Sequence, residues 1–556
     1  MSHDLIIRNG TVVDGSGQSR FSGDIAIDDG LISRIGNISE SAYEEIDATD
    51  KIVCPGFVDG HTHMDAQVFW EPLGTCSCYH GVTSVVMGNC GFTLAPVRAS
   101  ELDLVLSNLE RAEAIPAAAM RAGIDFCWET FSEFFDALEQ TAKGINYAGY
   151  VGHSALRTYA MGERAFSEPA NNDELAVMVE QLENAMRAGA VGFSTSRNPS
   201  HLRADDRPVA SRVATWDEVC HLVGAMGKLG GGIFEISREA SGGDAQTQAE
   251  FSDRLKALTK EAGVVTTFGV FTLASEPGGW RKYMELIDEA ATEGAQMFAQ
   301  VHSNTMYNYY SFETRLPVDD LPQWKAVRRR PLDQQMRAFL DPSLRAALRT
   351  ATDNASGTAA TLEVEKLKVV YTMEEPNPTV GELARANSVH PVDALLDAAL
   401  AADFALFFRE PFANADQDDA LELMRHPRSV VTFSDSGAHV TEIADSCLQT
   451  VLLSRWCRDR HAFTLEESVR KISFDVASHF GLRNRGLLRE GYAGDVVVMD
   501  YDKLQPQMPS VVADLPTGAK RVFQGCDGID ATVVNGQILL RDSEHTGALP
   551  GRLLKP

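Results

Sequence analysis

Two histidines, His61 and His63, are separated by one residue in the run FVDGHTHMD, which begins at Phe57. In a β-strand, alternate side chains point to the same face, so these imidazoles would lie about 6–7 Å apart on one side of the chain. Two imidazoles at that spacing can hold one metal ion. Most strand histidines are merely hydrogen-bonded, however, so the interpretation depends on which other residues lie nearby.

Further reactive side chains stand where apolar runs end. In a barrel of parallel strands, functional residues lie at the carboxyl ends of the strands, so we expect these side chains to converge. They are Cys90 in GNCG, His153 in GHS, His302 in QVHS, and Asp435 in SDSG, which His439 follows shortly after.

The elements that would position them alternate between apolar strands and helical patterns. This alternation predicts a parallel sheet, and about eight repeats predict an α/β fold of the (β/α)₈ TIM-like barrel type over residues 55–484. A capping box from Thr464 to Glu467 predicts the start of one helix, which ends near Phe480. The predicted strands are Val82–Met87, Tyr147–Val151, Ala190–Phe193, Ile233–Ile236, Val264–Phe268, Met297–Val301, Ala405–Phe408 and Val430–Phe433.

Both ends of the chain have a different pattern, that of short strands joined by tight turns. Asp29-Gly30 and Asn535-Gly536 each separate two apolar runs, which is a strong hairpin signal. We therefore predict one discontinuous β-sandwich domain, built from residues 1–54 and 485–545.

One segment, at about residues 305–352, is too long for an ordinary barrel connection. It is rich in aromatic residues and contains the run Arg328-Arg329-Arg330. An inserted lid and a homo-oligomer contact both fit this composition, and the sequence does not separate them.

Composition excludes several classes of protein. The chain has 78 acidic against 50 basic residues, a net charge of −28, which argues against a nucleic-acid partner. No run approaches the roughly 18 apolar residues of a membrane span, and the first residues lack the pattern of a secretory signal. Nine cysteines, an odd number, do not make a disulfide framework. We expect a cytoplasmic enzyme with mostly buried, reduced thiols and a small-molecule substrate.

Six motifs carry a resemblance that covers nearly the whole chain: PGFVDGHTHMD, HGVTSVVMGNCGFTLAPV, YVGHSALR, VGFSTS, FSDSGAHV and RGLLREGYAGDVVVMD. Together they resemble the amidohydrolase superfamily, in particular its D-aminoacylase (N-acyl-D-amino-acid deacylase) branch. The resemblance implies a metal-bearing barrel beside a small β domain. It also implies that His61 and His63 are metal ligands, that Cys90 replaces a carboxylated lysine as ligand, and that Asp435 orients water and moves its proton.

Two departures from the family pattern matter. The stretches FEISRE (Phe234–Glu239) and VTTFGV (Val265–Val270) lack the histidines that the family supplies there, and the family's carboxylate-binding lysine is not evident. The sequence therefore favours one zinc ion (Zn²⁺) per site, held by His61, His63, Asp435 and Cys90. His302 and Glu235 are further candidates to complete the ligand set.

The predicted reaction is hydrolysis of an amide C–N bond, as in an N-acyl-D-amino-acid deacylase. Zn²⁺ lowers the pKa of a water that it binds from 15.7 to about 7. Asp435, His153 and His302 are the predicted catalytic residues, with His153 also contacting the substrate carbonyl. Arg203 and Arg212, in the loop from Arg197 to Arg212, are predicted to bind an anionic substrate group.

Two other functions remain open from the sequence. The first is hydrolysis of another amide, such as a formamide, a ureide or a cyclic amide. The second is a catalytically silent scaffold, which would contain no stoichiometric zinc.

Overall fold

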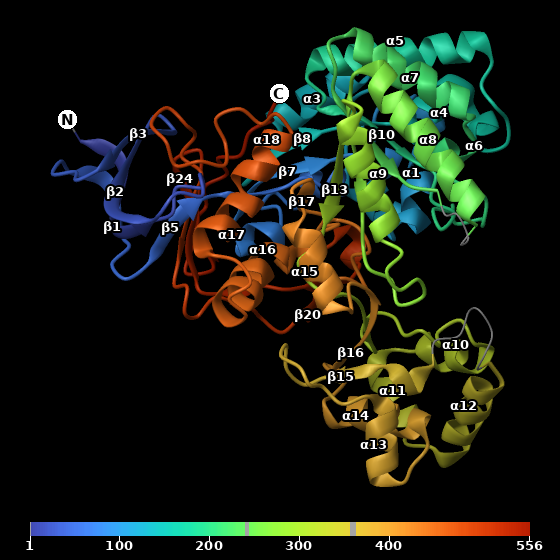
Figure 1. Cartoon of the computed structure of the whole chain (residues 1–556). Helices are drawn as coiled ribbons and strands as arrows, with labels where there is room; N and C mark the ends of the chain where they lie inside the picture. The colour runs from blue at the N-terminus through green and yellow to red at the C-terminus, as the bar shows by residue number, and fades with distance from the viewer. Residues whose placement is uncertain (1, 240–243, 356–362) are drawn as a thin grey trace.

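Eight parallel strands, counting β8 and β9 as one, surround the centre of the molecule in the computed structural model (Figure 1). The structure describes residues 2–239, 244–355 and 363–556. The barrel strands, in the order in which they pair, are β6 (Phe57–Asp59), β7 (Val82–Met87), β8 (Asn146–Gly149) with β9 (Val151–Gly152), β10 (Gly192–Ser196), β11 (Ile233–Ser237), β12 (Val265–Gly269), β13 (Gln296–Val301) and β17 (Ser429–Val431).

The last strand closes against the first just beyond their carboxyl ends. Thr62 and Ser436 form a parallel bridge, and the amide of Asp435 donates to the carbonyl of His61 at 3.1 Å. The buried carboxylate of Asp59 accepts hydrogen bonds from Thr432 Oγ1 (2.8 Å) and from the amide of His61 (3.2 Å). The closure thus holds the segment that follows β6, with His61, against the segment that follows β17, with Asp435.

Helices cover the outside of the barrel. Amphipathic helices such as α5 begin at side-chain caps, and their apolar faces join the largest core cluster. The predicted capping box of Thr464 and Glu467 is confirmed at the start of α17. The helices of this part are α1 (Leu102–Ala112), α2 (Ala117–Gly123), α3 (Phe131–Gln140), α4 (His153–Met161), α5 (Asn172–Ala188), α6 (Ala210–Val213), α7 (Trp216–Lys228), α8 (Ala245–Ala262), α9 (Arg281–Thr292), α15 (Gln417–Arg425), α16 (Leu448–Val451), α17 (Leu465–Ile472) and α18 (Phe474–His479).

Strands from both ends of the chain form one nine-stranded sheet beside the barrel (Figure 1). Antiparallel pairing of β5 with β18 joins the two halves, and both predicted hairpin turns are present. The strands are β1 (His3–Val12), β2 (Phe21–Asp28), β3 (Leu31–Gly36), β4 (Ala42–Asp47), β5 (Ile52–Pro55), β18 (Val496–Met499), β23 (Ile529–Val534), β24 (Gln537–Arg541) and β25 (Glu544–His545).

The last residues of the chain run along barrel strand β8. The amide of Gly551 donates to the carbonyl of Lys143 at 2.7 Å, and the amide of Leu554 donates to that of Tyr147 at 2.7 Å. A Cβ atom on Gly551 would lie only 2.0 Å from the carbonyl oxygen of Ile145, so this close approach requires glycine.

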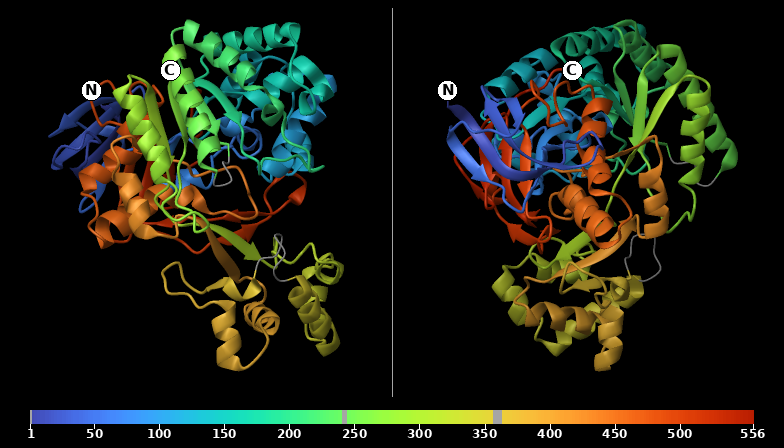
Figure 2. Two further views of the ribbon diagram at one scale, coloured as in Figure 1. Left: turned by 45° about the vertical axis from the view of Figure 1, so that its right-hand side comes forward. Right: turned by 60° about the vertical axis from the view of Figure 1, so that its left-hand side comes forward.

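The segment between β13 and β17 forms a separate lobe with its own hydrophobic cluster (Figure 2). The predicted insertion ended near residue 352, but the lobe's three-stranded sheet continues to Ala413. Ala405–Phe408, predicted as a barrel strand, contributes to β16 of this sheet. A short buried strand has the same sequence pattern in either sheet. The lobe contains β14 (Met306–Ser311), α10 (Pro322–Arg328), α11 (Leu332–Ala338), α12 (Pro342–Ala355), β15 (Lys368–Val370), α13 (Val380–Asn387), α14 (Pro391–Ala401) and β16 (Phe407–Ala413).

All nine cysteines are free thiols, and seven of them are buried, as predicted. Among the described residues, no helix has both the length and the apolar character that a bilayer crossing needs.

Candidate active site and metal centre

His61 and His63 lie side by side just beyond β6, with ring centroids 5.5 Å apart. Both side chains are fully buried. The Nδ1 atom of His61 lies 2.7 Å from Oε1 of Gln300, so a proton on Nδ1 donates to this amide and leaves the Nε2 lone pair for another partner. Nδ1 of His63 has no hydrogen-bond partner among the described residues, whereas its Nε2 faces carboxylate oxygens.

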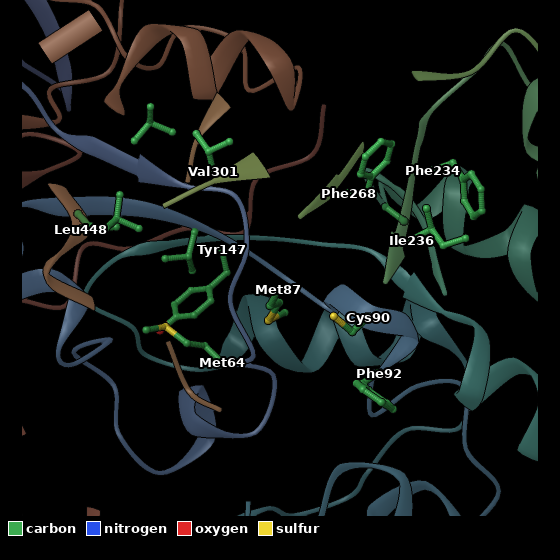
Figure 3. Packing of buried hydrophobic residues seen from close by; sticks show 14 of the residues in the cluster. Met64, Met87, Cys90, Phe92, Tyr147, Phe234, Ile236, Phe268, Val301 and Leu448 are labelled. Carbon is green, nitrogen blue, oxygen red and sulfur yellow. The ribbon is translucent and has the colours of Figure 1, made fainter. Parts of the chain in front are cut away.

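Cys90 lies at the carboxyl end of β7, where its thiol faces the histidines. Its Sγ atom is 3.6 Å from Nε2 of His61. The backbone of Cys90 is left-handed (φ 56°), a conformation that is unfavourable for every residue type except glycine. Its amide donates to Oε2 of the buried Glu235 at 2.7 Å. Figure 3 shows Cys90 among the buried side chains near Met87 and Phe92.

Asp435 approaches both histidines with the same carboxylate oxygen. Its Oδ1 atom lies 3.1 Å from Nε2 of His63 and 3.6 Å from Nε2 of His61. Asp435 and His439 both have positive φ angles, of 58° and 45°. Strained backbone of this kind persists only where the surrounding structure holds it in place, and it clusters at functional sites. The structure therefore brings together His61, His63, Cys90 and Asp435, as expected from the sequence.

Two further residues reach the cluster that the sequence analysis did not select. Glu113 follows α1 and is buried, with Oε2 3.5 Å from Nε2 of His63 and 3.9 Å from Nε2 of His439. His201 lies in the loop after β10, and its potential ligand nitrogen is within 4.8 Å of donor atoms on Cys90 and Glu113. The sequence had marked the loop from Arg197 to Arg212 for its arginines. His201 is the single histidine in this loop, and it could have been selected as a candidate ligand on that ground. Glu113 lies in the connection between α1 and α2, where no sequence motif identifies it as a site residue.

The structure corrects the assignments of His153 and His302. His153 Nε2 lies 3.0 Å from Glu218, and its Nδ1 lies 2.8 Å from Thr195 Oγ1. His302 accepts the amide of Asn304 at Nδ1 (2.9 Å), and its Nε2 lies 3.4 Å from a backbone carbonyl. Protein groups lie against both nitrogens of each ring, and neither histidine belongs to a donor group around Cys90 or Asp435.

The structure also corrects the assignments of Arg203 and Arg212, which do not line the cavity beside the cluster. The Arg203 guanidinium lies 3.8 Å over the ring of Phe166, with Glu163 Oε1 3.6 Å away. Arg212 donates from Nη1 to the carbonyl of His201 at 3.0 Å, which fixes the loop that carries this histidine.

Three residues of the cluster, Cys90, Glu113 and Asp435, line a cavity of about 1000 Å³. Its wall includes Arg238, which stacks 3.6 Å over the ring of Tyr283 and donates from Nε to the carbonyl of Gly269 at 3.0 Å. Among the described residues, no carboxylate forms a salt bridge with Arg238, whereas Arg111, another arginine of the wall, is paired with Asp206. The inserted lobe contributes part of the wall. Apolar lining residues include Phe271, Leu273, Trp280, Met306, Phe412 and Phe433.

Burial and charge set the protonation of the cluster. Burial lowers the pKa of His61 to about 3, which keeps its imidazole neutral. Burial also lowers that of His63, but the carboxylates of Glu113 and Asp435 outweigh it and raise the pKa to about 9. Burial raises the pKa of Glu113 and that of Glu235 to about 8 each. The pKa of Asp435 is lowered, because the adjacent histidines outweigh its burial.

The donor set fits a divalent metal ion. Imidazole, thiolate and carboxylate are the usual zinc ligands, and the donor atoms of His61, His63 and Cys90 lie within 4.8 Å of one another. The bond between His61 and Gln300 is the type of contact that fixes the tautomer of a metal-binding histidine. Nε2 of His63 lies among carboxylate oxygens of Asp435 and Glu113, at 3.1 and 3.5 Å, which are the neighbours that a shared metal ion would have.

A barrel with this donor set at its carboxyl end is typical of metal-dependent hydrolases. A model of the amidohydrolase family matches residues 44–540, and the chain belongs to that family. It is 27% identical to a D-aminoacylase of Alcaligenes xylosoxydans xylosoxydans over 558 residues, which cover 99% of this chain and 97% of the relative.

Other relatives agree with this placement. An N-acyl-D-aspartate deacylase of the same organism is 27% identical over 558 residues, covering 100% of this chain and 95% of the relative. The fold is similar to the structure of an N-acyl-D-glutamate deacylase from Bordetella bronchiseptica complexed with zinc and a phosphonate inhibitor. The TM-score is 0.68, with 23% identity and full coverage of both chains.

Proposed function

We propose that this protein is a metal-dependent amide hydrolase that removes the acyl group from N-acylated D-amino acids. The observation that carries the proposal is the convergence of His61, His63, Cys90 and Asp435 beside a large cavity, which Cys90 and Asp435 line. The D-aminoacylase and the N-acyl-D-aspartate deacylase to which the chain is similar support the substrate class.

His61, His63, Cys90 and Asp435 would hold the ion, which we propose to be zinc. When bound, zinc supplies a Lewis acid that polarises the amide carbonyl and acidifies water. Asp435 turns Oδ1 toward the histidines, which leaves Oδ2 to take a proton from the attacking water. The same atom then delivers the proton to the leaving nitrogen, so that the amine departs neutral.

The other cavity residues match the remaining parts of an N-acyl amino acid. Arg238 supplies a cation for the carboxylate, and the apolar wall accepts a hydrocarbon group. Arg238 thus takes the role that the sequence had given to Arg203 and Arg212. Of the histidines on the wall, His439 exposes 33% of its side chain, and we place it as a donor to the carbonyl oxygen.

A substrate panel tests the proposal. Zinc-loaded protein is assayed for release of free amine from N-acetyl-D- and N-acetyl-L-amino acids, and for opening of cyclic amides, ureides and formamides. We expect hydrolysis of the D-series compounds and none by the Asp435→Asn variant. Turnover of cyclic amides, ureides or formamides alone would overturn the substrate class. Absence of bound zinc after loading would instead indicate the silent scaffold.

A further inference from the structure

The strained turn that carries the candidate thiol ligand is bonded through its backbone to β11. Oε2 of Glu235 accepts the amide hydrogen of Cys90 at 2.7 Å, and both residues are buried. With a φ angle of 56°, the Cys90 backbone persists only where its surroundings hold it. Loss of the acceptor would leave a buried amide unpaired, which costs about as much as a lost hydrogen bond.

A second contact of the same kind lies on the neighbouring strand. Ser194 on β10 pairs in register with Glu235, and its Oγ accepts the amide hydrogen of Gly91 at 3.0 Å. A Cβ atom on Gly91 would lie only 3.0 Å from Cα of Thr195, so the turn packs directly against β10. Two successive amides of the turn are therefore fixed to two adjacent strands of the barrel.

Glu235 itself lies apart from the candidate ligands. Among the described residues, three groups have donor atoms within 4.8 Å of one another, and Glu235 belongs to none of them. Its Oε2 is already occupied by the amide of Cys90. The sequence left Glu235 as a candidate ligand, whereas its contact in the structure is with the backbone of a ligand.

We propose that Glu235 is a positioning residue, whose hydrogen bond to the Cys90 amide holds the turn in the conformation that presents the thiol to the metal. This inference rests on the proposed zinc site, and it requires an acceptor oxygen on residue 235 but no negative charge. Without the acceptor, the Cys90 backbone can leave the left-handed region, which moves Sγ away from Nε2 of His61, now 3.6 Å distant.

Two substitutions separate the acceptor from the charge. Glu235→Gln keeps a side-chain oxygen for the Cys90 amide, whereas Glu235→Leu removes it. Thr267→Val is the matched control, because the buried Thr267 on β12 pairs in register with Glu235 and donates to the carbonyl of Phe298 rather than to the turn. Circular dichroism verifies that each variant is folded.

Cobalt substitution reports the binding of the thiol without measuring activity. The wild type, Glu235→Gln and Thr267→Val should show a thiolate-to-cobalt absorption band of equal intensity. In Glu235→Leu the band should weaken. Zinc should also bind this variant about 10–100-fold more weakly, as is usual when a partner of a metal ligand is lost.

The outcomes separate this inference from the proposed function. An unchanged band and affinity in Glu235→Leu would overturn the inference and leave the proposed hydrolase intact. Equal losses in Glu235→Gln and Glu235→Leu would also overturn it, because the carboxylate would then act by its charge, as a ligand does. Absence of the band in a wild type that still binds cobalt would remove Cys90 from the ligand set and the inference with it. No bound ion in the wild type would overturn both proposals.

Hydrogen exchange in the metal-free proteins tests the bond directly. Mass spectrometry of peptides that include residues 88–91 should show one more fast-exchanging amide in Glu235→Leu than in the wild type, Glu235→Gln and Thr267→Val. Equal exchange in all four proteins would overturn the inference. Fast exchange of the Cys90 amide in the folded wild type would overturn it whether or not the leucine variant folds.

Discussion

Gln300 accepts a hydrogen bond from His61 inside the barrel, with 2.7 Å between Oε1 and Nδ1. This bond selects the imidazole tautomer whose Nε2 faces Cys90 and Asp435. Replacing Gln300 by leucine removes the acceptor. Partners of this kind change metal affinity by about 10–100-fold, so we expect zinc to bind Gln300→Leu that much more weakly in competition with a chromogenic chelator.

The matched control for this variant is Gln181→Leu. Gln181 is a buried glutamine on α5, outside the barrel interior. It should bind zinc as the wild type does. Equal loss of affinity in both variants would show that the effect comes from general loosening of the fold rather than from the orientation of His61.

Asp435 is expected to be essential for turnover and dispensable for folding. General acid–base catalysis contributes about 10²–10⁴-fold to the rate, so Asp435→Asn should lower kcat by that order. The melting temperature should stay within a few degrees of that of the wild type, and asparagine keeps one oxygen for the metal. Near-normal kcat in a zinc-loaded Asp435→Asn sample would contradict the assigned role. Asp173→Asn, an exposed change on α5, controls for loss of charge.

Arg238 is expected to recognise the substrate carboxylate. A charge-assisted hydrogen bond contributes about 1.5–3 kcal/mol, so Arg238→Met should lower kcat/KM for N-acetyl-D-amino acids roughly 10–100-fold. For substrates whose carboxylate is masked as an amide, the same variant should show nearly the kcat/KM of the wild type. Arg203→Met removes an arginine that lies outside the cavity wall and should leave KM unchanged. A similar loss on charged and masked substrates would refute carboxylate recognition.

Glu218 is expected to set part of the acid sensitivity of the fold. Burial raises the pKa of its carboxyl, but hydrogen bonds and charge from His153 and Arg157 outweigh this and lower it from 4.5 to about 2. A depressed carboxyl pKa stabilises the fold above the unfolded value, and this stabilisation is lost as the pH falls from about 4.5 to 2. The shift corresponds to roughly 3 kcal/mol.

Thermal unfolding between pH 7 and pH 3 tests this expectation. Glu218→Gln leaves the buried guanidinium of Arg157 without its carboxylate, so the melting temperature should fall at pH 7. The difference from the wild type should shrink as the pH approaches 3. Glu250→Gln, an exposed change on α8, should follow the wild type. A constant difference at every pH would exclude the ionised Glu218 as the cause.

Much of the barrel could be predicted from sequence because strand and helix periodicities alternate so regularly. His61, Cys90 and Asp435 could be selected because each follows an apolar run, and strand ends meet at one face of a barrel. His153 and His302 follow the same rule, yet the fold turns them toward other partners. Position at a strand end indicates proximity to a site but does not fix side-chain direction.

The inserted lobe and the donor residues in loops were harder to predict because their positions depend on contacts between distant parts of the chain. The β16 segment has the pattern of a barrel strand, and only its pairing with β14 and β15 shows where it belongs. Glu113 and His201 reach the cluster through long-range packing of loops, which leaves no local signature. A search for isolated histidines in loops after strands would have selected His201.

The pairing of residues 551–554 with barrel strand β8, together with that of β5 with β18, has a consequence for synthesis on the ribosome. Strands β5 and β8 emerge early but must wait for partners that lie more than 400 residues later in the chain. Contacts of such long sequence separation slow folding. We expect the fold of the nascent protein to stay incomplete, and the chain to need protection from aggregation, until residues 551–554 have left the exit tunnel.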